Sequence, residues 1–102
     1  MTSFVSAVAQ AWSELAAPLV ERGFKCGTNQ AAQLGKAVIE IEGPDRSALI
    51  EIWEHAHCLD TTVHHNSSNH GATLAAGPCE SHAEALARLA ALQAALLAPA
   101  SE

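Results

Sequence analysis

The first part of the chain has the apolar spacing of an amphipathic helix. Its bulky apolar residues recur every three or four positions, which places them on one side of a helix. These residues are Phe4, Val8, Trp12, Leu15 and Leu19. The spacing predicts a helix over 3–22, followed by Gly23 in the left-handed conformation. Pro18 has no backbone N–H to donate, and we expect it to kink the last turn or to end the helix near residue 17.

A second helical pattern occupies residues 81–98. Ser81 and Glu84 have the S-x-x-E spacing of a capping box, in which each side chain binds the backbone N–H of the other residue. A stripe of leucines follows at helical spacing, and Pro99 ends it. The leucines are Leu89, Leu92 and Leu96, with Leu86 and Leu97 beside them. The pattern predicts a helix at this end of the chain.

Between the two helices the apolar residues alternate with polar ones, which is typical of strands with one buried side. Ala37, Ile39 and Ile41 form one such series, and a Gly-Pro-Asp turn follows them. The predicted strands are 37–42, 48–56, 59–65 and 72–76, with a tight reversal near His57 and Cys58 and a turn cluster at 66–71. Residues 25–35 have no sustained period, and we interpret them as a loop or a ragged edge strand.

The connections between these strands determine the predicted fold. They are too short for parallel pairing, which needs a crossover of a dozen or more residues, so we expect an antiparallel meander. Each helix has a single apolar stripe, which favours placing both helices on one face of the sheet. The sequence therefore predicts a single α+β domain over 1–102, with an N-terminal helix, four antiparallel strands and a C-terminal helix. The other sheet face is left to solvent or to a partner.

The strand predicted at 48–56 carries the candidate binding residues. If Ile50 and Ile52 face the helices, period two places Trp53 on the opposite, uncovered face. A tryptophan among acidic and imidazole groups on such a face is typical of a protein-binding hot spot. The candidate residues are Glu40, Glu42, Glu51, Trp53 and His55.

Three other interpretations of this face stay open. A β-bulge near Trp53 would turn the indole inward. Alternatively, Trp53 covers the outer face by packing on the neighbouring strands. The face is also suited to self-association into a dimer.

Charge and cysteine content narrow the classes of partner. The chain has five basic and eleven acidic residues and a formal charge of −6, which disfavours nucleic-acid binding and suits a basic protein partner. Three widely spaced cysteines do not make a disulfide framework, and we expect reduced thiols and a cytoplasmic location. We expect no signal peptide and no membrane span, because no basic cluster and no long apolar run is present.

The six histidines suggest an alternative function as a metal-binding module or sensor. His55 and His57 are spaced to share a strand face, and Cys58 and His64 are near in sequence. However, the chain lacks C-x-x-C and H-E-x-x-H motifs, so we predict no metal site and no cofactor. It also lacks a phosphate-binding glycine loop and a nucleophile turn, so we predict that it is not an enzyme.

One segment resembles a known family. Residues 39–54, IEIEGPDRSALIEIWE, and the CLD tripeptide at 58–60 resemble bacterial immunity proteins of polymorphic toxin systems, specifically the TriTu type. The resemblance covers residues 36–65 and the overall layout, with helices at both ends. The His- and Asn-rich residues 64–70 and the Ala-rich last strand depart from the family pattern. The resemblance implies that the chain neutralises a cognate secreted toxin by binding it.

Overall fold

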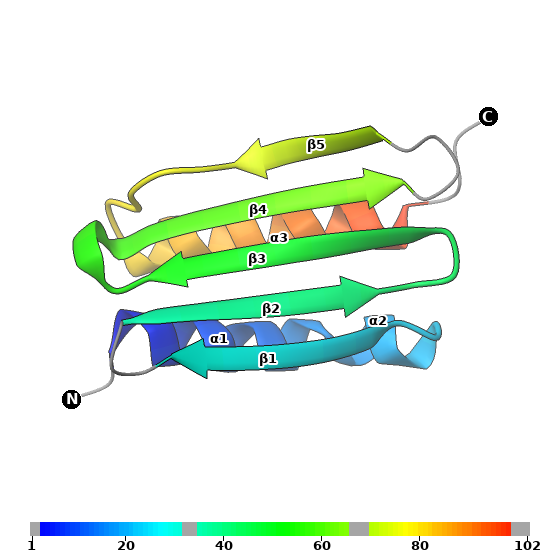
Figure 1. Cartoon of the computed structure of the whole chain (residues 1–102), viewed down its shortest axis with the longest axis horizontal. Helices are drawn as coiled ribbons and strands as arrows, with labels where there is room; N and C mark the ends of the chain where they lie inside the picture. The colour runs from blue at the N-terminus through cyan, green and yellow to red at the C-terminus, as the bar shows by residue number, and fades with distance from the viewer. Residues whose placement is uncertain (1–2, 32–34, 66–69, 99–102) are drawn as a thin grey trace.

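The computed structural model describes residues 3–31, 35–65 and 70–98. Within these ranges a helical segment, five strands and a C-terminal helix follow one another along the chain (Figure 1). Their bounds are α1 Phe4–Leu15, α2 Ala17–Glu21, β1 Lys25–Ala31, β2 Lys36–Glu42, β3 Arg46–Trp53, η2 His55–His57, β4 Cys58–His65, β5 His70–Ala75 and α3 His82–Leu97. Among these residues no helix is both long enough and apolar enough to cross a membrane.

The five strands form one antiparallel sheet in the order β1-β2-β3-β4-β5. Figure 1 shows α1 and α3 side by side on the same side of this sheet. The predicted α+β class and the antiparallel meander are therefore confirmed, whereas the strands and helices of the described residues differ in number from the prediction. The turn cluster predicted at 66–71 lies mostly outside the described residues, and 70–71 belong to β5.

The number of strands was predicted wrongly, because β1 is a full strand. It pairs with β2 along its whole length, from Lys25 opposite Glu42 to Ala31 opposite Lys36. An edge strand is held by backbone hydrogen bonds to a single neighbour, and such bonds require no alternation of apolar side chains. The sequence of β1, KCGTNQA, consequently carries no periodic signal.

The N-terminal helix is divided where Pro18 was expected to act. α1 ends at Leu15 and α2 begins at Ala17, with the proline in the first turn of α2, where its missing N–H leaves no bond unmade. The two helices remain in line through Ala16, whose N–H donates to Trp12 O at 2.8 Å. The single helix predicted over 3–22 is therefore two consecutive helices.

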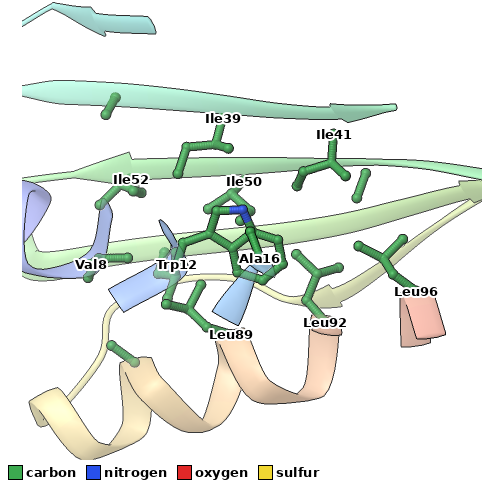
Figure 2. Close-up of a cluster of buried hydrophobic side chains, with 14 of the residues drawn as sticks. Val8, Trp12, Ala16, Ile39, Ile41, Ile50, Ile52, Leu89, Leu92 and Leu96 are labelled. Atoms are coloured by element: carbon green, nitrogen blue, oxygen red, sulfur yellow. The ribbon is translucent and has the colours of Figure 1, made fainter. Parts of the chain in front are cut away.

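The core lies between the helices and the covered face of the sheet (Figure 2). The indole of Trp12 is 2% exposed and lies between Ile50 of the sheet and Leu89 of α3. Its Nε1–H has no hydrogen-bond partner. The Cys26 thiol is near this N–H without hydrogen-bond geometry; partial burial raises the pKa of that thiol, and the indole lowers it by less.

The two ends of α3 are fixed differently. At the N-terminus Ser81 Oγ accepts the N–H of Glu84 at 3.1 Å, as predicted, but the Glu84 carboxylate accepts the N–H of Glu80 and not that of Ser81. At the C-terminus the buried Arg46 guanidinium donates to the carbonyls of Ala95 and Ala98 at 3.0 and 2.9 Å. The positive charge of Arg46 also interacts favourably with the negative end of the α3 helix dipole.

Candidate functional site

One face of the sheet has no described helix over it, and we call it the open face. Figure 1 looks onto this face, with the helices behind the strands. On the three central strands its side chains are half-buried or exposed, whereas the residues between them are buried. These open-face residues are Lys36, Val38, Glu40, Glu42, Ser47, Leu49, Glu51, Trp53, Cys58, Asp60, Thr62 and His64.

Trp53 belongs to the open face. The pairing of β3 with both neighbours is continuous up to Trp53, which lies opposite Lys36 on β2 and Cys58 on β4. The only register shift in the sheet described here is between Thr61 and Thr62, in the pairing of β4 with β5. The interpretation that a bulge turns the indole inward is therefore wrong.

Trp53, Glu51 and Lys36 form a compact cluster at one end of the open face. The Lys36 ammonium nitrogen lies 4.9 Å from the centroid of the Trp53 ring. The same nitrogen is 3.7 Å from Glu51 Oε2, and the two charged side chains are 36% and 32% exposed. An aromatic face and a carboxylate thus hold one ammonium group between them, at the surface of the protein.

The other acidic candidates lie farther along the same face. Glu40 is opposite Leu49, and Glu42 is opposite Ser47. Both pairs lie farther along β2 and β3 than Glu51, the nearest member of the Trp53 cluster. Together with Lys25 and Leu49 they line a shallow hollow of about 700 Å³. The predicted set is therefore spread over the open face and does not converge on a single pocket.

His55 is not part of β3, because β3 ends three residues earlier than predicted. Residues 54–57 form a turn that contains η2, and in it Ala56 and His57 have φ values of 58° and 51°. β3 ends at Trp53 because Glu54 already has helical dihedral angles, and the two left-handed residues after it turn the chain toward β4. His55 instead lines a second hollow of about 380 Å³ with Trp53, Cys58 and Asp60.

The turn is anchored to α1 through Glu54, a residue whose role the sequence did not reveal. Its carboxylate accepts the N–H groups of Phe4 and Val5 at 3.0 and 3.1 Å, two donors that a helix cannot satisfy internally. These bonds hold the pKa of Glu54 below its ordinary value of 4.5. The His57 ring stacks on Phe4 with centroids 4.5 Å apart. The available signal was the period of β3, which places this charge on the helix side.

The electrostatic character of the open face is acidic. Four carboxylates project from its central strands, those of Glu40, Glu42, Glu51 and Asp60, against the single ammonium of Lys36. Lys25 of the neighbouring β1 contributes one more positive charge beside Glu42. Such an excess attracts a basic partner over distances of about 8 Å at physiological ionic strength.

The described residues give the metal hypothesis no geometric support. No three histidine, cysteine, aspartate or glutamate side chains gather there in an arrangement that would hold an ion. His64 and His65 lie on opposite faces of β4, because they are adjacent on one strand. The thiols of Cys26, Cys58 and Cys79 are all free.

Comparisons of the chain with protein-family models, with curated proteins and with solved structures give no match. The similarity to TriTu-type immunity proteins therefore rests on the segment quoted above and on the layout of the elements. The open face, with its aromatic and charged groups, is the feature from which a function can be argued.

Proposed function

We propose that this chain is a non-catalytic protein-binding module whose open face holds a basic protein partner. The observation that carries the proposal is Trp53, a large aromatic residue on the sheet face that no described helix covers. Tryptophans in such positions dominate the energetics of many interfaces, because they bury a large area with few rotatable bonds. The acidic groups around it supply complementarity to a basic surface.

The resemblance to TriTu-type immunity proteins suggests which partner this is. An immunity protein needs a stable scaffold and a complementary surface, and it needs no chemistry of its own. The core residues on the covered face stabilise the fold, and the open-face side chains are not part of that core. We therefore propose a cognate secreted toxin domain as the partner, and the cytoplasm as the place where the two meet.

A second copy of the chain is a less favourable occupant of the open face. Face-to-face pairing of two copies would bring the carboxylates of Glu40, Glu42 and Glu51 near those of the other copy. Like charges opposed across an interface are destabilising unless they are paired. Light scattering at increasing protein concentration tests this directly, and a stable dimer blocked by Trp53→Ala would contradict the proposal of a basic partner.

The binding experiment uses the product of the gene adjacent to the one that encodes this chain. The candidate toxin domain is expressed in a bacterial host with and without this protein, and growth is measured. We expect growth to be restored by the natural chain and lost with Trp53→Ala or Glu51→Lys. Purified proteins then give the Kd, which we expect to rise at least tenfold for either variant.

Two control variants lie on the helical layer. Val20→Ala truncates a side chain that is 56% exposed on α2, and Glu21→Lys reverses an exposed charge on the same helix. Both are expected to restore growth as the natural chain does. Equal loss of protection by variants of both layers would mean that the open face is not the binding surface.

A further inference from the structure

The cluster of Trp53, Glu51 and Lys36 has the composition of a binding seat for a cation. Its aromatic face attracts positive charge through the ring quadrupole, and its carboxylate supplies the opposite charge at the rim. In the structure the seat is filled from within the chain, by an ammonium 4.9 Å from the ring centroid and 3.7 Å from the carboxylate. The chain's own lysine thus shows which chemistry the site accepts.

Lys36 is a weak occupant of this seat. Its distance of 3.7 Å to Glu51 Oε2 is longer than a charge-assisted hydrogen bond, which measures about 2.7–2.9 Å. Both charged side chains are about one third exposed, and exposed ion pairs of this kind contribute little. Lys36 is also the first residue of β2, next to Gly35, so its long side chain can swing away without disturbing the sheet core.

A guanidinium satisfies the same seat better than an ammonium does. It is planar, stacks on an indole face, and donates two parallel hydrogen bonds to one carboxylate. The hollow lined by Trp53, His55 and Asp60 adjoins the ring and offers room through which an incoming side chain can approach it. Asp60 there adds a second acidic group, although one of its oxygens already accepts the N–H of Gly77.

From these contacts we propose that Trp53 and Glu51 form the recognition site for an arginine side chain of the partner, which displaces Lys36. This inference rests on the proposed function, since it names the group by which a basic partner is held. In this arrangement Lys36 acts as an internal competitor that lowers the affinity for any cation. Removing Lys36 therefore strengthens arginine binding, an effect that a merely structural role of the cluster does not produce.

The test uses small probes and needs no partner protein. N-acetyl-arginine amide is titrated into the 15N-labelled natural chain and the Lys36→Ala variant, with N-acetyl-citrulline amide as the uncharged isostere. The shift of the Trp53 indole N–H reports on the seat, and the buried Trp12 indole serves as the internal reference. We expect saturable shifts of Trp53 with the arginine probe alone, and binding about two- to fivefold tighter in Lys36→Ala.

Glu51→Gln in the Lys36→Ala background is expected to remove most of the binding, whereas Glu14→Gln on the exposed side of α1 leaves it unchanged. Equal shifts with the citrulline probe would show an apolar surface and overturn the inference, as would no saturable shift in Lys36→Ala. The proposed function fails separately, when Trp53→Ala leaves toxin binding intact. A toxin complex that is sensitive to Trp53→Ala, but is neither strengthened by Lys36→Ala nor weakened by competition from the arginine probe, leaves the function standing and removes the arginine seat.

Discussion

The two faces of the sheet are built from alternating residues of the same strands, yet their side chains have opposite environments. On the covered face Ile39, Ile41, Ile50 and Ile52 are at most 1% exposed and pack against the helices. On the open face Val38, Leu49 and Trp53, their immediate sequence neighbours, are only half-buried. The period of a strand thus separates the residues that hold the fold together from those that are free to bind.

The charged groups of the two faces differ in the same way. Arg46 on the covered face is 4% exposed, and its guanidinium donates to Asp45 and to the last carbonyls of α3. Lys36 and Glu51 on the open face share one long contact. A buried charge must be fully paired, because desolvation is expensive, whereas a surface charge can exchange partners. The charged groups of the open face can therefore exchange their present contacts for new ones, whereas Arg46 cannot.

The two tryptophans give the largest expected difference. Trp12→Ala removes a buried indole from the core and is expected to lower the free energy of unfolding by about 3–5 kcal/mol. Trp53→Ala removes a half-buried ring held by an exposed cation, and we expect a loss of about 1–2 kcal/mol. Chemical denaturation of both variants measures the difference. Equal losses would show that the open face belongs to the core of the fold.

The charges of the two faces provide the next largest contrast. Arg46→Met preserves the length and apolar stem of the side chain but leaves the carbonyls of Ala95 and Ala98 without their donor. We expect a loss of about 2–4 kcal/mol, against less than about 0.5 kcal/mol for Glu51→Gln. Urea midpoints of the two variants decide the matter. A small effect of Arg46→Met would mean that water replaces the guanidinium at the end of α3.

The core of this fold was predictable because it is periodic. The isoleucines of β2 and β3 and the leucines of α3 are spaced as strands and helices require, so the covered face could be inferred before the structure. The same alternation placed Trp53 and Glu51 on the open face. β1 was predicted only as an alternative to a loop, since Cys26, Gly27 and Thr28 pair with β2 through their backbone and carry no apolar pattern.

The long-range contacts could not be read from the sequence. Glu54 binds the start of α1, 49 and 50 positions away, and Arg46 binds carbonyls 49 and 52 positions away. No local spacing specifies such pairs. The reversal between β3 and β4 was predicted near His57 and Cys58, but it spans residues 54–57. Its early start gave no signal, because Ala56 and His57 are in a conformation that usually favours glycine, asparagine or aspartate. For this reason His55 was assigned to a strand face that ends before it.

Glu54 joins the turn after β3 to α1, and its removal should have an intermediate effect on the free energy of unfolding. Glu54→Ala leaves the Phe4 and Val5 N–H groups without an acceptor, and by analogy with helix caps we expect a loss of about 1 kcal/mol at neutral pH. The pKa of Glu54 lies below its ordinary value of 4.5, so the carboxylate stabilises the fold above that pH. This contribution is lost as the pH falls from about 4.5 through the lower folded value.

Denaturation of Glu54→Gln and of the natural chain between pH 7 and pH 2 tests this pH dependence. The stability difference between the two proteins should be largest at neutral pH and should shrink toward the acid end, where the natural carboxyl is protonated. Glu84 and Asp45 also have lowered pKa values, but they titrate in both proteins and cancel in the difference. A difference that stays constant with pH would show that the Glu54 charge does not contribute.

The smallest expected effect comes from the turn that joins β3 to β4, where two neighbours share a backbone conformation but not a role. Ala56 and His57 both have positive φ, which costs a residue with a side chain about 1–2 kcal/mol relative to glycine. Glycine gives back part of this through the greater entropy of the unfolded chain. Ala56→Gly is therefore expected to stabilise the protein by about 0.5 kcal/mol. His57→Gly relieves the same strain but removes the ring stacked on Phe4, and we expect it to be neutral or destabilising.

Thermal melts of the two variants, measured side by side, separate backbone strain from side-chain contact. If both variants gained stability equally, the stack on α1 would contribute nothing, and the turn would be independent of the covered face. If Ala56→Gly lost stability, the left-handed conformation of Ala56 would not be strained.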